Sequence, residues 1–524
     1  MFGPLRRSRT LVRTGFFRSD PPPPSKPYYF IDPEDPLFSV ADEFRYTDDP
    51  TMKNPVLERS NVGMGMVLTN SDVSTTRFTN MLYRKLRDLE VNTLKRFTAV
   101  TASDKKLPIG PMGLRHLLLL AEACRNEDDG IRELAKNHFL ESLRNQADLS
   151  LVVADYFKPL VTLLNGADSG IAISSLANNS ACYKDSVIEF NLTRYGMVPT
   201  GGLSFALAKT PWNIGEFLAL TSRRITGQNI LFSGLAKRWI SPEAFPFMEV
   251  TSEHKLEVSE RDGKALLSEH FLVPPNDWSL RPFVSVINES FGQDHFEDIV
   301  RSLRRISGSQ SSDPKISSFA KECLERMSES DPLALRLTHA LIRRARNHIR
   351  HANEAVAEEI GADTVSFMER KHPGLFQEQV LRPAMIKTLQ DELRVAYRIL
   401  DTDRFRDRLH NYIVGDSKKS QEEWDRFTIS TSKLDEYFQP LPTELEYRYS
   451  ERSDFPLSAH PKLRKFHPDF NPKTGLDHDP QFMAREVVRW SDDYMQSELE
   501  DIRSAVSGLS ISEIRNNSTI RWDN

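Results

Sequence analysis

The spacing of apolar residues changes along the chain, and the change marks two kinds of structure. Between about residues 62 and 236, short apolar runs alternate with segments whose apolar residues recur every three or four positions. The runs GMGMVLTN, FTAVTAS and PLVTLLNG predict buried strands, and segments such as TTRFTNMLYRKLRDLEVNTL predict helices. This part of the chain therefore has the alternating pattern of an α/β fold.

Beyond residue 236 the pattern is mostly helical. FEDIVRSLRRI, SSFAKECLERM, DPLALRLTHALIRRARN and TLQDELRVAYRIL all carry apolar residues at helical spacing. Asp331 followed by Pro332 predicts the start of a helix, because aspartate caps free amides and proline suits the first helical position. Residues 347–386 continue the pattern and predict a helical hairpin.

The two ends of the chain differ from the middle in composition. Residues 1–19 contain five arginines and no acidic residue, with serine and threonine between them. This composition is typical of a mitochondrial transit peptide, and a solvated basic tail is the alternative. Residues 20–57 are rich in proline and acidic residues, which predicts an extended arm. Residues 442–524 form a C-terminal extension, with a loop-like first part and a predicted amphipathic helix after it.

Composition and charge exclude several classes of protein. The chain has 524 residues, 39% hydrophobic and 27% charged, which is typical of a globular protein. No run approaches the roughly 20 apolar residues that span a bilayer, so we expect no membrane contact. The three cysteines lie far apart, which fits a reducing compartment and argues against a structural zinc site. A net charge of −5 argues against general electrostatic binding of nucleic acid.

Residues 158–236 carry motifs that resemble a known family. The segments NGADSGIAISSL (165–176) and FNLTRYGMVPTGG (190–202) are similar to loops of the crotonase (enoyl-CoA hydratase/isomerase) superfamily. Within it, they and TLQDELRVAYRIL look most like 3-hydroxyisobutyryl-CoA hydrolases. The resemblance implies a crotonase-like α/β spiral of ββα turns over residues 58–270. It also implies a helical C-terminal region over residues 271–441, in which residues 347–386 are an insertion.

The resemblance also implies where acyl-CoA chemistry would take place. The hydrolases use a glutamate and an aspartate, and here Leu192 and Thr200 occupy the matching positions. Leucine cannot transfer a proton, and threonine has no suitable pKa without a partnering base. Glu189 is a conceivable substitute, but three residues from Leu192 on a strand it would face the opposite side.

Two loops that supply the family's oxyanion-binding amides are also altered. The matching amide positions are Ile109, which lies between Pro108 and Pro111, and Ile171. The prolines remove amide hydrogens from the first loop, and a branched side chain replaces glycine in the second. The sequence therefore predicts a pseudoenzyme, with no catalytic residue, no cofactor and no metal.

A group of cations lies in the segment LIRRARNHIRH, within about three helical turns. As phosphate-contacting groups its arginines are candidate RNA contacts, and a solvated helix face is the alternative: Arg343, Arg344, Arg346 and Arg350. His348 and His351 have the i, i+3 spacing of metal ligands, but the sequence suggests no third ligand.

These features lead to three hypotheses about function. The first follows from a resemblance to the hydrolase-derived protein of some protist and plant mitochondrial ribosomes. It is a catalytically inactive structural component of the mitochondrial ribosome small subunit, in the matrix, with ribosomal proteins as partners and rRNA as a further contact. The second is an active mitochondrial acyl-CoA hydrolase or hydratase of valine catabolism with relocated catalytic residues. The third is a non-catalytic CoA-binding protein.

Overall fold

A computed structural model gives the structure of the middle of the chain. The described residues are 56–60, 63–69, 76–91, 95–102, 113–156, 160–164, 167–168, 176–177, 179–241, 272–273, 278–308, 313–371, 376–414, 427–443 and 445–447. The predicted transit peptide, nearly all of the proline-rich arm and nearly all of the C-terminal extension lie outside these residues. Within them, no helix is both long enough and apolar enough to cross a membrane.

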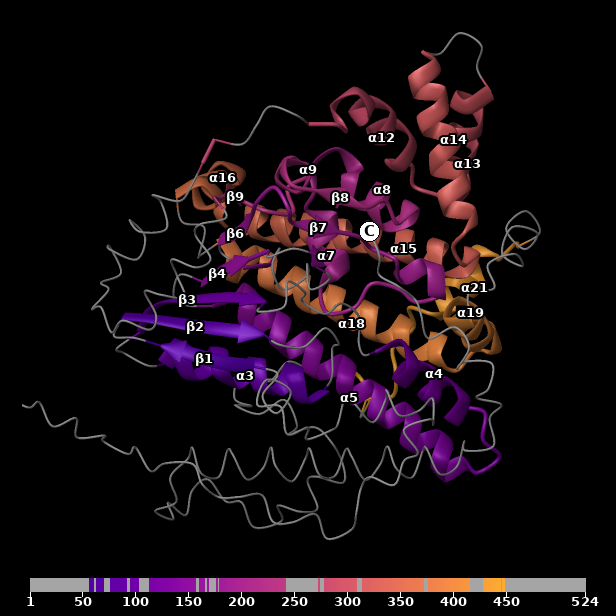
Figure 1. Cartoon of the computed structure of the whole chain (residues 1–524), viewed down its shortest axis with the longest axis horizontal. Helices are drawn as coiled ribbons and strands as arrows, with labels where there is room; N and C mark the ends of the chain where they lie inside the picture. Colours follow the sequence, from indigo (N-terminus) through magenta and orange to yellow (C-terminus); the bar gives the residue numbers. More distant parts are fainter. Residues whose placement is uncertain are drawn as a thin grey trace, which may run out of the picture.

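A mixed sheet of six strands forms one layer of the fold (Figure 1). Its strands lie in the order β1, β2, β3, β4, β6, β9, and only the β1–β2 pair is antiparallel. The bounds are Val56–Ser60 for β1, Gly63–Thr69 for β2, Lys95–Ala102 for β3, Leu160–Leu163 for β4, Asn179–Cys182 for β6 and Arg238–Trp239 for β9. The strands predicted from GMGMVLTN, FTAVTAS and PLVTLLNG are thereby confirmed.

The strands of a second, smaller sheet come from segments that lie between β4 and β9 in the sequence. It contains β5 (Ala167–Asp168), β7 (Val187–Ile188) and β8 (Ile225–Thr226), in that order. β5 and β7 are parallel, whereas β7 and β8 are antiparallel. The strand β7 ends at Ile188, before the segment that resembles the catalytic loop of the hydrolases.

The helices of the first half follow the predicted periodicity. In α3 the apolar residues Phe78, Leu82, Leu86 and Leu89 recur at helical spacing, and all four are buried. The bounds are Thr76–Val91 for α3, Leu114–Ala123 for α4, Asp129–Ala154 for α5, Leu192–Tyr195 for the 3-10 helix η1, Leu203–Ala208 for α7, Pro211–Asn213 for the 3-10 helix η2, Ile214–Thr221 for α8 and Gln228–Phe232 for α9.

The second half is helical, as the sequence predicts. Asp331 caps α15, since its side chain accepts a hydrogen bond from the amide of Ala334 at 2.7 Å. The bounds are Arg281–Phe283 for η3, Val284–Phe291 for α12, Phe296–Gly308 for α13, Pro314–Ser328 for α14, Pro332–Ile360 for α15, Ala362–Lys371 for α16, Gln377–Leu381 for the π-helical segment η4, Arg382–Leu400 for α18, Asp403–Val414 for α19 and Thr431–Glu436 for α21.

The two halves of the chain share one hydrophobic core. It contains Leu192 and Phe205 from the first half and Met385 and Leu393 from the second. The helix α15 packs against α7 and α8, and α18 packs against α5 and α7. The predicted α/β layer with C-terminal helices is therefore confirmed, and the C-terminal helices form part of the same core. The exact boundaries proposed for each region stay predictions.

Candidate functional site

The turn before α7 contains the segment that we expect, from its sequence resemblance, to correspond to the aspartate-bearing loop of the hydrolases. Gly201 (φ +63°) and Gly202 (φ +80°) both lie in the left-handed region, which glycine adopts without strain. A Cβ atom on Gly201 would lie 2.7 Å from Cγ of Gln146, so α5 packs tightly against this turn. Ser150, also on α5, donates a hydrogen bond to the carbonyl of Gly201 at 2.6 Å. The turn is therefore fixed by α5 on one side.

Thr200 and Leu192 are both buried at this site. Thr200 is 5% exposed, and within the described part of the chain its hydroxyl makes no hydrogen bond. Leu192 is 3% exposed and belongs to the hydrophobic core. Neither side chain titrates near neutral pH, so neither can serve as a general acid or base without a partner.

The local structure around Leu192 differs from the sequence expectation. We placed Leu192 and Glu189 on one strand, facing opposite sides, but the strand ends at Ile188 and Leu192 begins η1. The two side chains therefore do not alternate across a strand, and that prediction is wrong. Glu189 is one-third exposed at its side chain and lies 4.0 Å from the guanidinium of Arg194.

Two residues of the C-terminal helical region donate hydrogen bonds to backbone carbonyls of this 3-10 turn. The amide of Asp331, at the start of α15, donates to the carbonyl of Thr193 at 2.8 Å. Arg408 on α19 donates from Nε to the carbonyl of Arg194 at 2.8 Å. These contacts place η1 between the core and the C-terminal helices. Leu192, the residue that we expect at the glutamate position of the hydrolases, is thus buried in a turn that the C-terminal helices contact.

A carboxylate that the sequence analysis missed lies against the turn. Glu392 on α18 is 1% exposed, and its two oxygens accept hydrogen bonds from the amides of Gly202 and Ser204, both at 2.7 Å. Burial raises the pKa of Glu392 to about 7, although the two amide donors act in the opposite direction. Because both oxygens are occupied, this carboxylate caps the start of α7.

One signal in the sequence could have identified Glu392. It lies three residues after Leu389 and four before Ala396, both buried, so it falls within the apolar stripe of α18. A carboxylate in an apolar stripe requires a polar partner inside the protein, because an unpaired buried charge is costly. The partner, a backbone turn 190 residues earlier, could not be named from spacing.

Three of the four candidate RNA-contacting arginines pair with acidic residues of other elements. Arg343 contacts Asp294, Arg344 lies 2.9 Å from Asp391, and Arg346 lies 2.5 Å from Glu216. Arg350 lies 3.8 Å from Glu354 on its own helix, and both side chains are about 60% exposed. The RNA hypothesis for α15 stays a prediction, and the ion pairs leave Arg350 as its most accessible member.

Arg346 stabilises an unusual loop. Trp212 (φ +53°) and Asn213 (φ +57°) are consecutive left-handed residues, a rare conformation outside glycine. Arg346 donates to Oδ1 of Asn213 at 2.5 Å, to the carbonyl of Ala208 at 3.2 Å and to Oε2 of the fully buried Glu216 at 2.6 Å. Burial raises the pKa of Glu216, and Arg346 opposes this shift. Arg346 therefore stabilises the fold through contacts within the protein.

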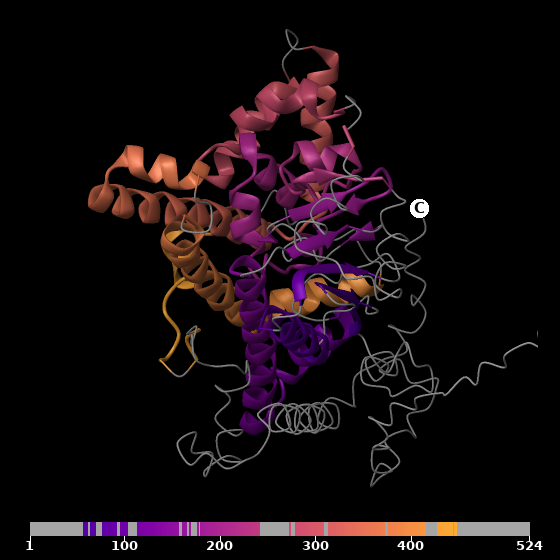
Figure 2. The same ribbon diagram turned by 90° about the vertical axis from the view of Figure 1, so that its left-hand side faces the viewer.

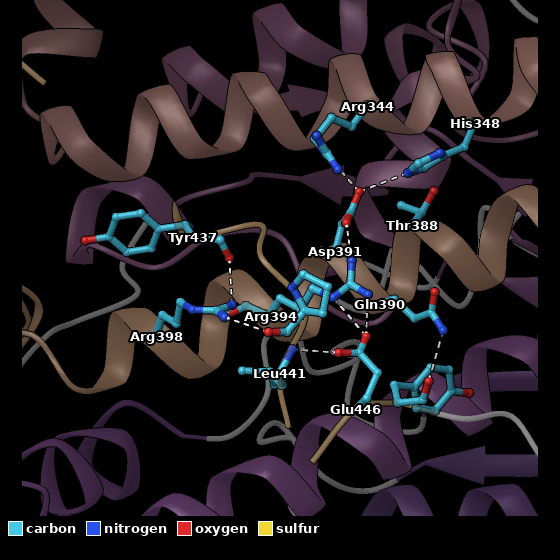
Figure 3. A network of polar contacts seen from close by, with 12 residues as sticks. Arg344, His348, Thr388, Gln390, Asp391, Arg394, Arg398, Tyr437, Leu441 and Glu446 are labelled. Carbon is cyan, nitrogen blue, oxygen red and sulfur yellow. Dashed lines mark hydrogen bonds and ion pairs between the residues drawn. The ribbon is translucent and has the colours of Figure 1, made fainter. Parts of the chain in front are cut away.

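Asp391, next to Glu392, is the centre of a polar network (Figure 3). Its Oδ2 accepts hydrogen bonds from Arg344 and from Nε2 of His348, both at 2.9 Å, and its Oδ1 accepts from Arg394 at 3.1 Å. Burial alone would raise the pKa of Asp391, but hydrogen bonds from His348 and Arg344 hold it below its ordinary value. His348 is thus engaged with a carboxylate of α18.

The same network attaches the C-terminal segment to α18. Arg394 contacts Glu446 at 2.6 Å, and Glu446 accepts a hydrogen bond from the amide of Leu441 at 2.8 Å. Arg398 donates to the carbonyls of Tyr437 at 3.0 Å and Pro440 at 3.2 Å (Figure 3). Charge-assisted hydrogen bonds of this kind fix geometry strongly. Tyr437, Pro440 and Glu446 are therefore bound along the helix that also carries Glu392.

Other predicted site residues cannot be placed. The oxyanion positions Ile109 and Ile171 both lie outside the described residues. In the part of the chain that the structure describes, no group of three or more His, Cys, Asp and Glu side chains could hold a metal ion. The geometry thus offers one fixed turn, a buried cap, and two uncharged side chains at the positions where the sequence resemblance leads us to expect carboxylates in the hydrolases.

Comparisons with known proteins connect this geometry to a family. The model of the family described as Enoyl-CoA hydratase/isomerase matches residues 121–372. The solved carnitinyl-CoA dehydratase of Mycobacterium thermoresistibile superposes with a TM-score of 0.56 and 18% identity, covering 76% of this chain and 100% of that one. At this identity the likeness concerns the fold alone.

Several curated relatives match part of the sequence, and the following two are examples. The mitochondrial 3-hydroxyisobutyryl-CoA hydrolase-like protein 1 of Arabidopsis thaliana is 28% identical over 225 residues, covering 42% of this chain and 53% of the relative. Small ribosomal subunit protein mS47 of Schizosaccharomyces pombe is 26% identical over 229 residues, covering 43% and 51%. The chain thus spans about half the length of the curated relatives it matches.

Proposed function

Because this chain belongs to the crotonase (enoyl-CoA hydratase/isomerase) superfamily, we propose that it is a member without hydrolase activity that serves as a structural component of the mitochondrial ribosome small subunit. One observation carries the proposal. The positions that the hydrolases give to their glutamate and aspartate hold Leu192 and Thr200, and both side chains are buried in this fold. A scaffold that keeps its core and lacks its acid–base groups is suited to assembly.

The relatives are consistent with this role and with its location. Proteins named small ribosomal subunit protein mS47 match this chain in Schizosaccharomyces pombe and other organisms. The arginine-rich residues 1–19 and a relative named as mitochondrial support a place in the mitochondrial matrix. We expect ribosomal proteins as the main partners and rRNA as a further contact, with no catalytic cofactor.

Sedimentation and hydrolysis together test the proposal. The full-length chain, tagged at its C-terminus and expressed in its own mitochondria, should sediment with the small ribosomal subunit. The purified chain should release no free CoA from 3-hydroxyisobutyryl-CoA beyond the uncatalysed rate, with an authentic hydrolase as the positive control. Cleavage at a rate comparable to that control, or a chain that stays at the top of the gradient, contradicts the proposal.

One observation favours a second candidate function, an acyl-CoA hydrolase with a relocated carboxyl group. Glu392 lies against the turn that carries Thr200, and burial raises its pKa to about 7, in the range of a general acid or base. If this candidate is right, kcat/KM should follow a group with a pKa near 7, and Glu392→Gln should abolish that dependence. The exposed Glu436→Gln is the matched control. A chain that shows no turnover rules this candidate out.

A further inference from the structure

The helix α15 continues well past its buried part. Its buried residues end at Ala345, and none of residues 346–360 is fully buried. Gly361 (φ +88°) then reverses the chain into α16. Figure 2 shows the two helices, in salmon to orange, reaching out side by side from the body of the protein. We call residues 351–371 the outer hairpin.

A small core of its own keeps the outer hairpin in shape. Val365 and Met368 of α16 pack with Phe376 and Val380, in a cluster separate from the main core. Ala352, Val356 and Ala357 of α15 close this cluster from the other side. Because these apolar side chains pack against one another, they hold the two helices of the hairpin in a fixed arrangement.

Two large apolar side chains are exposed on this projection. Ile360, at the turn, is 38% exposed, and Phe367 on α16 is 50% exposed. Within the described part of the chain only three other large apolar side chains are as exposed: Trp212, Leu272 and Val273. Apolar side chains at the end of a projecting element are suited to contact with another molecule, since burying them there gains free energy.

The charge around these side chains indicates the kind of partner. Residues 351–369 contain five acidic residues and no lysine or arginine, which gives −5 in 19 residues when His351 is neutral. All five are exposed: Glu354, Glu358, Glu359, Asp363 and Glu369. Arg370 and Lys371 follow this segment, so the outer hairpin as a whole carries −3, more than half of the net −5 of the 524-residue chain. A cationic partner would relieve the repulsion among these carboxylates.

We infer that the outer hairpin is a docking surface for a lysine- and arginine-rich protein segment, whose apolar side chains cover Ile360 and Phe367. The inference rests on the proposed function and names the class of partner that this element contacts. RNA and anionic lipid fit poorly, because residues 351–369 would place five carboxylates and no lysine or arginine opposite their phosphates. The inner part of α15 thus supports the fold, whereas its outer part, which belongs to the outer hairpin, binds protein.

Carbodiimide crosslinking tests this contact directly. The reagent joins a carboxylate to a lysine amine only where the two groups touch. Applied to the full chain in its native complex from mitochondria, it should join Glu354, Glu358, Glu359 or Asp363 to lysines in a basic segment of another protein. Absence of such crosslinks, crosslinks only to lysines of this chain, or ultraviolet crosslinks from the hairpin to RNA overturn the inference.

Matched variants separate this surface from general charge effects. Reversal of the four residues Glu354, Glu358, Glu359 and Asp363 to lysine should weaken association with the crosslinked protein by about tenfold or more, and more so at low salt. Reversal of four exposed acidic residues elsewhere is the control with the same change in charge: Glu127, Glu133, Asp435 and Glu436. The double variant Ile360→Ser, Phe367→Ser should weaken association several-fold without lowering the thermal midpoint.

The outcomes also distinguish this inference from the proposed function. A chain that does not sediment with small subunits, yet crosslinks through the hairpin to a basic protein, contradicts the ribosomal role and retains the docking surface. A chain that sediments with small subunits and loses nothing on charge reversal retains the ribosomal role and contradicts the docking surface. Equal loss in the control variant also counts against a specific contact.

Discussion

Glu392 on α18 caps the turn before α7 through the amide of Gly202, a residue 190 positions earlier in the chain. The second oxygen accepts the amide of Ser204, so the carboxylate satisfies two donors at the start of a helix. This contact joins the part of the chain that resembles a catalytic loop to the helices that follow it. Its strength can be measured.

Replacing the carboxyl group of Glu392 by an amide should destabilise the protein. Glu392→Gln keeps the size of the side chain but replaces one acceptor oxygen by an NH2 group. One of the two backbone N–H donors then faces another donor, so one hydrogen bond is lost. We expect a decrease of about 1–3 kcal/mol in the free energy of unfolding, measured by urea denaturation. Glu436→Gln, at an exposed position, should change it by less than about 0.5 kcal/mol. Equal effects of the two substitutions would contradict the capping role.

The same residue should make stability depend on pH. Burial raises the pKa of Glu392 from its ordinary value of 4.5 to about 7, so the folded state binds the proton more tightly. The resulting stabilisation is complete below pH 4.5 and is lost as the pH rises through 7. The difference in unfolding free energy between wild type and Glu392→Gln should therefore change by up to about 3 kcal/mol between pH 4.5 and 8. A constant difference would show that the carboxyl group stays ionised throughout.

Arg346 should matter more to stability than Arg350 on the same helix. Arg346→Ala leaves the fully buried Glu216 without its cation and frees Asn213 from its left-handed conformation. We expect a loss of about 3 kcal/mol or more, measured by denaturant unfolding. Arg350→Ala removes an exposed pair and should cost less than about 0.5 kcal/mol. If both variants melt like the wild type, Arg346 does not hold this loop.

The turn before α7 should tolerate only glycine at residue 201. Gly201→Ala introduces a Cβ atom 2.7 Å from Gln146 at a φ of +63°, so both contact and conformation oppose it. We expect a destabilisation of about 1–3 kcal/mol by thermal unfolding. Gly308→Ala provides the control, because a Cβ atom there meets nothing within 4 Å. That variant should be neutral or slightly more stable.

Restoring carboxylates at the family's positions should not create an enzyme. Leu192→Glu with Thr200→Asp places two charges at sites that are 3% and 5% exposed, where they lack described partners. We expect a loss of several kcal/mol in stability and no release of CoA from 3-hydroxyisobutyryl-CoA. Leu192→Met, which keeps the volume and adds no charge, should cost less than about 1.5 kcal/mol. Appearance of turnover in the double variant would indicate that an acyl-CoA pocket is still open.

Local patterns were enough to predict most elements of this fold. The period of Phe78, Leu82, Leu86 and Leu89 predicted α3, and Asp331 with Pro332 predicted the start of α15. These signals succeed because they depend on neighbours three or four residues away. A helical hairpin also lies where residues 347–386 predicted one, although its status as an insertion stays a prediction.

The site was harder to predict, because its contacts join distant parts of the chain. Glu189 and Leu192 looked like neighbours on one strand, but the strand stops at Ile188 and a 3-10 turn follows. The arginines of α15 looked like an open cationic face, and their partners Asp294, Asp391 and Glu216 lie 47 to 130 residues away. Helical spacing does not encode which carboxylates the fold will bring opposite such a face.

The cap on Gly202 has a consequence for how the chain acquires its shape. Synthesis from the N-terminus delivers the turn long before the carboxylate that completes it. The first half of the chain therefore cannot complete its fold until α18 is available, and its apolar surfaces stay exposed until then. Closing a loop of this length also slows folding. Chaperones that bind partly synthesised chains would bind this chain in that interval. We expect a chain truncated before α18 to bind such chaperones persistently and never to reach the native state.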